Sequence, residues 1–255
     1  MQQQAQIALD NNWLQQARSV VTGRTPPPGF PQPGAYIDEE PHMRVAPSMD
    51  AGDRRIGATV CCRQPLVVAL DNVLSVAECE QLIRVGEQKL QRSMVLDMQD
   101  GSEVPSTVRT SRGAWLPEDA DALLPIVNRR LAQLTGWPQE NGEDLHLLNY
   151  SVGGEYKPHH DYFPFTEAGS QVHLARGGQR TATLIVYLND VEEGGATVFP
   201  KLGLSLQPRR GHAVYFEYTN SLNQVNPLCL HGGSPVVSGE KWIVTKWYHQ
   251  EPFEA

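Results

Sequence analysis

The spacing of apolar residues predicts a helix near the start of the chain. Apolar residues from Ala5 to Val21 recur at intervals of three to four, which predicts an amphipathic helix ending near Gly23. Residues 24–47 contain seven prolines, and proline interrupts both helices and strand ladders, so an extended connector is expected there. We expect the helix to pack on the main body; a partner-binding arm or a homodimer arm is the alternative.

The residue pattern in the middle of the chain predicts one strand and two helices. Residues 65–74 form a β-rich apolar run, and Ser75 is a suitable N-cap for the helix that follows it. A second helix is predicted from Pro117 to about Leu131, before the breaking sequence Gly136-Trp137-Pro138.

From Leu145 onward the period of the pattern changes from helical to strand-like. Four apolar strands are predicted at residues 145–150, 181–188, 213–217 and 242–248, with glycine-rich turns between them. Helices followed by many short strands indicate the α+β class, with a β-sandwich or jelly-roll core flanked by the earlier helices.

The composition narrows the class of protein and leaves its function open. The 255 residues include 21 Lys and Arg against 29 Asp and Glu, a net charge of −8. This acidity argues against nucleic acid as a partner, and the absence of an apolar run of roughly 18 residues argues against a membrane span. Four irregularly spaced cysteines do not form a disulfide framework, and the N-terminus lacks secretory features, so a cytoplasmic location is expected.

The tripeptide His159-His160-Asp161 is the first sign of chemistry. Residues i and i+2 of a strand face the same side, so His159 and Asp161 are placed to bind one metal ion. His231, which follows a short apolar stretch and precedes two glycines, is the candidate third ligand. Two histidines and one carboxylate with open positions form the facial triad of non-haem Fe(II) oxygenases, whereas closed zinc sites use four ligands, commonly thiolates.

Two alternatives bear on this interpretation. A His-x-Asp tripeptide is also common in surface turns, and a rival His-x-acid tripeptide lies at His249-Gln250-Glu251. Only four residues follow Glu251, so no later histidine completes a triad there. His160 is expected to face away from the metal by strand alternation.

Lys241 follows His231 by ten residues. Turn signals at residues 232–235 and 238–239 lead us to expect a hairpin that brings the strand near Lys241 beside the strand end that holds His231. An ammonium group there is suited to bind one carboxylate of a dicarboxylate that chelates the metal with its other end. A solvated surface lysine is the alternative.

Five ordered segments carry a resemblance to a known family. They read RTSRGAWL at 109–116, NYSVGGEYKPHHDYF at 149–163, GQRTATLIVYLNDVEEGGATVFP at 178–200, LHGGSPV at 230–236 and GEKW at 239–242. From about Pro65 to Tyr248 the chain resembles the prolyl 4-hydroxylase branch of the Fe(II)- and 2-oxoglutarate-dependent dioxygenases. The resemblance implies a double-stranded β-helix (jelly-roll) domain over residues 61–255. Residues 1–60 lie outside the resemblance, and their own pattern predicts a helical and proline-rich N-terminal extension.

The resemblance also implies roles for individual residues. The metal ligands fall on His159, Asp161 and His231, and the 2-oxoglutarate-binding lysine falls on Lys241. Tyr150 is implied near 2-oxoglutarate, as is a threonine for which Thr183 is preferred to Thr181. The candidate substrate residues are Tyr162, Arg180 and Trp247. The segment 164–177 is expected to form a lid over the substrate.

The activity implied by the resemblance is that of a procollagen-proline 4-dioxygenase. It uses Fe(II), 2-oxoglutarate and O2, with ascorbate as a helper reductant, to hydroxylate a prolyl residue of a peptide or protein and to release succinate and CO2. A hydroxylase of a free amino acid or small metabolite is the alternative, because one core serves several substrates. A metal-binding module without turnover is disfavoured, because the three ligands and the lysine are all present.

Overall fold

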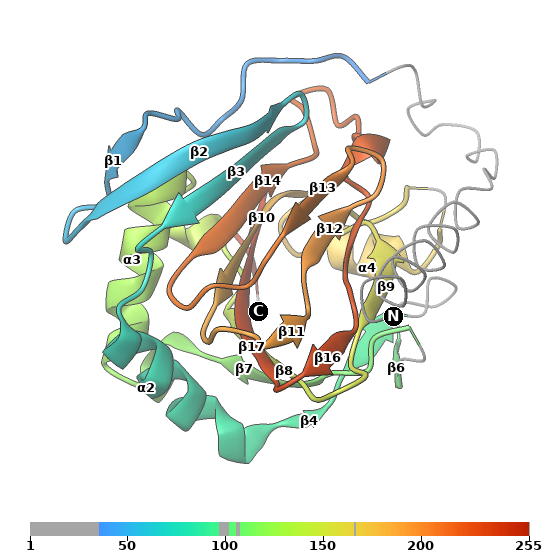
Figure 1. Ribbon diagram of the computed structural model, residues 1–255. Helices are drawn as coiled ribbons and strands as arrows, with labels where there is room; N and C mark the ends of the chain where they lie inside the picture. The colour runs from blue at the N-terminus through green and yellow to red at the C-terminus, as the bar shows by residue number, and fades with distance from the viewer. Residues whose placement is uncertain (1–35, 97–101, 106–107, 166, 255) are drawn as a thin grey trace.

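Two antiparallel sheets face each other, and helices cover the outer side of the larger one (Figure 1). This computed structural model describes residues 36–96, 102–105, 108–165 and 167–254. The predicted helix before Gly23 and the first part of the proline-rich connector lie outside the described residues. The remainder of the connector, residues 36–47, runs as irregular chain into the first strand. The arrangement confirms the α+β class with a jelly-roll core.

The larger sheet has nine strands and carries most of the site. Its order across the sheet is β1 (Ser48–Asp50), β2 (Arg55–Arg63), β3 (Leu66–Asp71), β14 (Ala213–Glu217), β10 (Arg180–Tyr187), β17 (Lys241–His249), β8 (Leu145–Tyr150), β7 (Arg112–Leu116) and β4 (Gln91–Arg92). The predicted strands at 145–150 and 213–217 are found with those bounds. β1 and the start of β2 come from the segment assigned to the N-terminal extension, and they pair with this sheet.

The smaller sheet has four strands and holds the metal-ligand candidates. Its order is β13 (Leu204–Leu206), β12 (Thr197–Phe199), β15 (His231–Gly233) and β9 (Tyr156–His159). The other strands of the described residues form two separate two-stranded ribbons. One pairs β5 (Met94–Leu96) with β6 (Glu103–Pro105), and the other pairs β11 (Glu193–Gly194) with β16 (Val236–Ser238).

The strand pairing corrects the predicted hairpin between His231 and Lys241. β15 pairs with β9 and β12 in the smaller sheet, whereas β17 pairs with β8 and β10 in the larger sheet. The chain between them therefore crosses from one sheet to the other, and β16 pairs with β11 on the way. His231 and Lys241 face each other across the space between the sheets instead of lying side by side.

Two α-helices pack on the outer face of the larger sheet. α2 (Val76–Gly86) begins with a complete capping box, in which Ser75 and Glu78 each accept a hydrogen bond from the other's backbone N–H. α3 (Leu123–Thr135) ends at Gly136, whose φ of 79° suits a residue without a Cβ atom. A further α-helix of the described residues, α4 (Ser170–Leu174), lies within the predicted lid segment.

The second predicted helix starts later than Pro117. A 3-10 turn, η2 (Glu118–Ala120), comes first, and Asp121 is extended with φ −162° and ψ 146°. The Asp121 carboxylate accepts a hydrogen bond from the Leu123 N–H at 2.8 Å, so the side chain competes with the helix and sets its start. The other 3-10 helices are η1 (Glu87–Lys89), η3 (Gln139–Asn141) and η4 (Pro227–Cys229).

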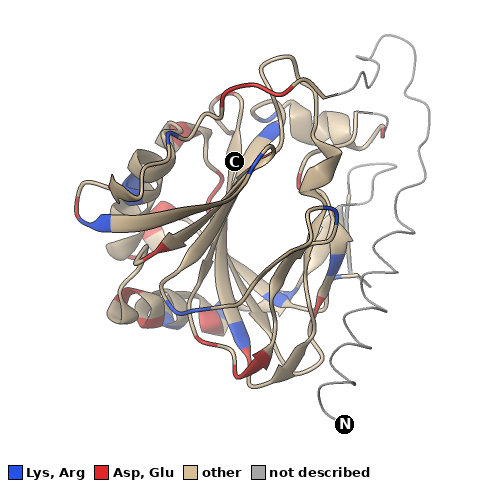
Figure 2. Cartoon of the chain, turned by 45° about the horizontal axis from the view of Figure 1, so that its top comes forward, with Lys and Arg blue, Asp and Glu red and all other residues tan. Residues whose placement is uncertain are grey.

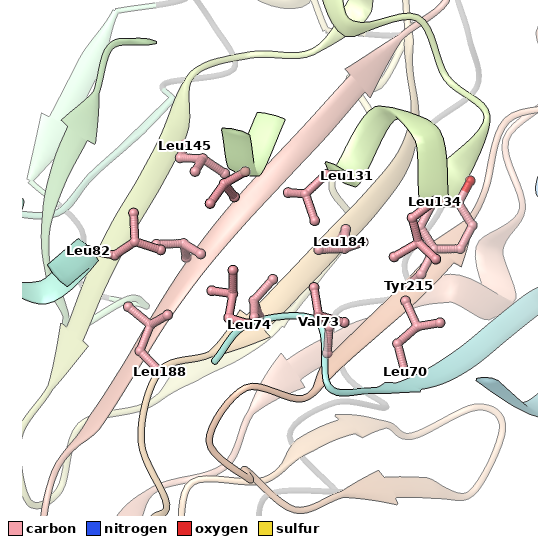
Figure 3. Packing of buried hydrophobic residues seen from close by; sticks show 14 of the residues in the cluster. Leu70, Val73, Leu74, Leu82, Leu131, Leu134, Leu145, Leu184, Leu188 and Tyr215 are labelled. Atoms are coloured by element: carbon pink, nitrogen blue, oxygen red, sulfur yellow. The ribbon is translucent and has the colours of Figure 1, made fainter. Parts of the chain in front are cut away.

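The hydrophobic core is divided by the larger sheet. On the helix side, Leu82 of α2 and Leu131 of α3 pack against strand residues such as Leu145 and Leu184 (Figure 3). Between the sheets, a second cluster includes Leu148, Ile185 and Phe216. The alternation along each strand therefore sends one set of side chains toward the helices and the other toward the site.

Residues of both charges are spread over the fold. In the view of Figure 2, Lys and Arg (blue) and Asp and Glu (red) both occur on helices, strands and loops. Within the described ranges, no helix has both the length and the apolar character needed to cross a membrane.

Candidate metal centre

Three potential ligands meet at the edge of the smaller sheet. His159 at the end of β9 is the cross-strand neighbour of His231 at the start of β15. Asp161 follows in the bend after β9, and its carboxylate oxygens lie 3.3 Å from His159 Nε2 and 3.5 Å from His231 Nε2. One ligand atom from each residue lies within 4.8 Å of the other two, and no other such group is found in the described part of the chain.

Backbone carbonyl groups orient both histidines. His159 Nδ1 lies 2.9 Å from the Lys157 carbonyl oxygen, and His231 Nδ1 lies 3.0 Å from the Cys229 carbonyl oxygen. A carbonyl only accepts, so each Nδ1 carries the proton and each Nε2 keeps a lone pair that faces the shared position. The ring of Tyr156 stacks on His159 with centroids 3.5 Å apart, which further restricts that imidazole.

The ionisation of His231 and Asp161 suits metal binding. Burial, together with His159 and His160, lowers the pKa of His231 to about 4, although Asp161 opposes the shift. Burial raises the pKa of Asp161, but His231, His159 and Arg180 outweigh it and hold the pKa well below its usual range. A neutral imidazole and an ionised carboxylate are the forms that bind metal.

The donor set fits Fe(II). Two imidazole nitrogens and one carboxylate leave further coordination positions for other ligands, as in the non-haem Fe(II) oxygenases. His159 is half-buried, whereas Asp161 and His231 have side chains only 7% and 3% exposed, so a bound metal would be accessible from one side.

Lys241 lies in the same pocket as the three ligands. The lining of this pocket includes His159, Asp161, His231 and Lys241. Lys241 is the cross-strand neighbour of Tyr150, and its ammonium lies 5.7 Å from the ring centroids of both Tyr150 and Tyr187.

The Lys241 ammonium is buried without a carboxylate partner among the described residues. The residue is 4% exposed, and burial lowers its pKa to about 7. An anion that enters the pocket would raise this pKa and favour the charged ammonium form of Lys241. Lys241 and the metal ligands are therefore placed to hold the two ends of one small dicarboxylate.

The three candidate substrate residues line an adjoining cleft of about 510 Å³, which also reaches His159 and Asp161. Arg180 lies 4.3 Å from the Trp247 ring centroid, and its Nη1 donates to the Asp161 backbone carbonyl at 3.4 Å. Tyr162 stacks on His160, whose Nε2 lies 3.2 Å from the Pro227 carbonyl oxygen.

Two functional contacts were missed by sequence reasoning. Glu143 binds Arg180 through distances of 2.6 and 3.0 Å and also lies 2.8 Å from His249 Nε2. His249 of the rival tripeptide therefore contacts Glu143, which holds Arg180 in the cleft, and it is not one of the three grouped metal-ligand candidates. No local pattern marks Glu143, because its partners are 37 and 106 residues away in sequence.

Thr183 lies beside the ligand cluster. Its hydroxyl donates to Asp161 Oδ2 at 2.7 Å, and the residue is fully buried. Thr181 instead donates to the Tyr248 carbonyl. The predicted contact between Thr183 and 2-oxoglutarate stays a prediction.

Comparison with known proteins defines first the class and then the family. Residues 145–249 match the family described as the 2OG-Fe(II) oxygenase superfamily. Probable prolyl 4-hydroxylase 8 of Arabidopsis thaliana is 38% identical over 78% of this chain and 72% of its own length. Prolyl 4-hydroxylase 1 of the same plant is 39% identical over 82% of this chain and 78% of its own length. The chain therefore belongs to the prolyl 4-hydroxylase family of Fe(II)- and 2-oxoglutarate-dependent dioxygenases.

Solved structures agree with this assignment. The viral collagen prolyl hydroxylase of Paramecium Bursaria Chlorella virus-1, solved as a 2OG complex, is 26% identical, with a TM-score of 0.56 over 73% of this chain and 97% of that one. A prolyl hydroxylase from Trichoplax adhaerens is 17% identical with a TM-score of 0.52, covering 72% of this chain and 83% of that one, which supports the shared fold.

Proposed function

We propose that this protein hydroxylates prolyl residues of a peptide or protein at C4. In the balanced reaction, the prolyl C–H bond, O2 and 2-oxoglutarate give the prolyl C–OH group, succinate and CO2. Relatives that match most of the chain carry the name prolyl 4-hydroxylase. The observation that carries the proposal is the cleft beside the candidate metal ligands.

The cleft is suited to an extended substrate. Its volume is about 510 Å³, and its lining includes His159, Asp161, Tyr162, Trp247 and the exposed Val108. Trp247 and Phe163 flank the Arg180 guanidinium at 4.3 and 4.9 Å, and apolar rings of this kind pack well on a prolyl ring. A free amino acid would fill only a small part of this cleft.

The residues of the site have distinct parts in the proposed reaction. His159, Asp161 and His231 would hold Fe(II), which with 2-oxoglutarate supplies the oxygenation chemistry. Lys241 binds the far carboxylate of 2-oxoglutarate. Aromatic walls around the pocket exclude water from the reacting atoms. Arg180, fixed by two hydrogen bonds to Glu143 and one to the Asp161 backbone carbonyl, lines the cleft.

The proposal also includes ascorbate as a helper reductant and a cytoplasmic location. The ascorbate requirement is tested by turnover with and without it: an unchanged number of turnovers before inactivation contradicts its role. A homodimer is tested by the mass of the protein in solution.

The main test supplies the protein with Fe(II), 2-oxoglutarate and O2 together with prolyl peptides or free proline. We expect succinate release to rise with a peptide, and mass spectrometry to show one added oxygen atom on that peptide. Asp161→Ala serves as the inactive control. Oxygenation of free proline but of no peptide would favour the small-molecule hydroxylase instead.

A further inference from the structure

The fully buried hydroxyl of Thr183 contacts a metal-ligand candidate directly. Thr183 lies on β10, as the cross-strand neighbour of Phe216 on β14 and Trp247 on β17. Its Oγ1 lies 2.7 Å from Asp161 Oδ2 and 3.0 Å from the hydroxyl of Tyr218. Thr183 is 0% exposed and Tyr218 is 1% exposed, so water does not compete for these bonds.

The direction of both hydrogen bonds follows from the chemistry of the three groups. A carboxylate that binds a metal is deprotonated and only accepts. The Thr183 hydroxyl must therefore donate its single proton to Asp161. Its oxygen is left to accept, so Tyr218 donates to Thr183. The chain of bonds runs in one direction, from Tyr218 through Thr183 to Asp161.

The backbone holds the start of this chain in place. The Tyr218 N–H donates to the Thr181 carbonyl at 2.9 Å, and the Tyr218 carbonyl accepts from the Asn226 N–H at 2.7 Å. The Tyr218 backbone is thus held through both its N–H and its carbonyl, and this fixes the residue that donates to Thr183. Because bonds in such a series polarise one another, each link strengthens the next.

The bond to Thr183 restricts how the Asp161 carboxylate rotates. Oδ2 is engaged by Thr183, whereas Oδ1 lies 3.3 Å from His159 Nε2. The Asp161 backbone carbonyl accepts from Arg180, so the residue is held at both its main chain and its side chain. An oriented carboxylate loses less freedom when a metal binds.

The pocket that contains Lys241 does not include Thr183 in its lining. The Thr183 hydroxyl already has one acceptor and one donor within the protein, so contact with 2-oxoglutarate would require it to give up one of them. We propose that Thr183 is a positioning residue that, with Tyr218 behind it, orients Asp161 for metal binding. This proposal rests on the proposed function only in taking Asp161 as a metal ligand.

The test measures metal binding in the absence of turnover. Thr183→Val keeps the side-chain shape and removes the hydroxyl, Thr183→Ser keeps the hydroxyl, and Tyr218→Phe removes the more distant donor. The affinity of each purified variant for Co(II) is measured by calorimetry, and the Co(II) absorption spectrum reports the coordination. The matched control is Thr181→Val, which removes a buried hydroxyl from the same strand that bonds to Tyr248 instead.

We expect Thr183→Val to weaken Co(II) binding by roughly 10- to 100-fold, the usual effect of removing a group that supports a metal ligand. Tyr218→Phe should have a smaller effect in the same direction. Thr183→Ser should restore affinity to within about threefold of the parent protein, and Thr181→Val should leave it unchanged. The Co(II) spectrum should change in Thr183→Val only.

The alternative role gives a different pattern of results. If Thr183 binds 2-oxoglutarate, Thr183→Val weakens 2-oxoglutarate binding at saturating Mn(II) and leaves Co(II) affinity unchanged, which overturns the proposal. Thermal unfolding of the metal-free variants identifies loss of fold. If Thr183→Val unfolds, a Tyr218→Phe variant with parental Co(II) affinity overturns the proposal. Because the assay needs no prolyl substrate, failure of the proposed function leaves this test intact.

Discussion

Replacing Lys241 with Met should separate 2-oxoglutarate binding from metal binding. Met fills a similar volume but carries no charge, and Lys241 is only 4% exposed. Burial lowers the pKa of Lys241 from 10.5 to about 7. One pKa unit corresponds to about 1.4 kcal/mol, so keeping the ammonium charged in this pocket costs roughly 5 kcal/mol. A bound carboxylate is positioned to offset much of that cost.

The expected loss of affinity follows from this magnitude. Removing one partner of a buried charge pair costs about 2 to 5 kcal/mol, and about 1.4 kcal/mol is a factor of ten. Lys241→Met should therefore weaken 2-oxoglutarate binding by roughly 30-fold to several thousand-fold. The affinity of the metal site itself should stay within about threefold of the parent, because Lys241 is not a ligand.

Calorimetric titration of 2-oxoglutarate into the Mn(II)-loaded protein measures this effect without turnover. Lys246→Met is the matched control, since Lys246 is a second buried lysine on β17 whose ammonium bonds to Asn128 on the helix side. This control should retain 2-oxoglutarate affinity. A folded Lys241→Met protein with parental 2-oxoglutarate affinity would refute the reasoning.

Three further predictions follow from the site and the core. Asp161→Ala should abolish Fe(II)-dependent succinate release; residual turnover at the parental rate would remove Asp161 from the ligand set. Since burial lowers the pKa of Lys241 to about 7, raising the pH from 7 to 8 should weaken 2-oxoglutarate binding by about fivefold, because the charged fraction of the free lysine falls from about one half to about one tenth. Lys241→Arg stays charged and should flatten this slope, and a pH-independent parent affinity would contradict the account. Arg130, which is 2% exposed and bonds to Asp53, Glu78 and the Val73 carbonyl, should stabilise the fold: Arg130→Met should cost about 3 kcal/mol and lower the melting temperature by about 6 to 12 °C. The exposed Arg44 pair with Glu40 provides the control, and equal melting temperatures for Arg44→Met and Arg130→Met would contradict this assignment.

The sequence predicts the ligand cluster well because local spacing carries most of the information. His159 and Asp161 are two residues apart, and a turn after a strand end keeps them together. His231 is the predicted third ligand because it follows a short apolar stretch and precedes two glycines, and its pairing with His159 places it beside that residue. The need for three ligands that converge on one metal ion therefore made this set of residues predictable from the sequence.

Lys241 was assigned to the correct pocket through an incorrect pairing. Turn signals at Gly232 and Gly239 suggested a hairpin, but the chain crosses between sheets and β17 is a central strand of the larger one. A local pattern identifies turns and strands without specifying which strands become neighbours. Which strands pair depends on contacts between side chains that are distant in sequence.

The support around the site was the least predictable part. Glu143 acquires its role by bonding to Arg180 and His249, and each of these contacts forms only after the strands have paired. Thr183 was predicted as a contact of 2-oxoglutarate, while its hydroxyl bonds to Asp161. A hydroxyl on a buried strand has the same sequence pattern in either role, so the neighbouring side chains decide between them.

Amino-acid analysis of a prolyl peptide after turnover with isotopically labelled O2 tests the central claim most directly. The account predicts 4-hydroxyproline that contains one labelled oxygen atom, formed in equal amount with succinate, and no such product from Asp161→Ala. Hydroxyproline whose oxygen comes from water, or succinate release without any oxygenated prolyl residue in the peptide, would contradict it.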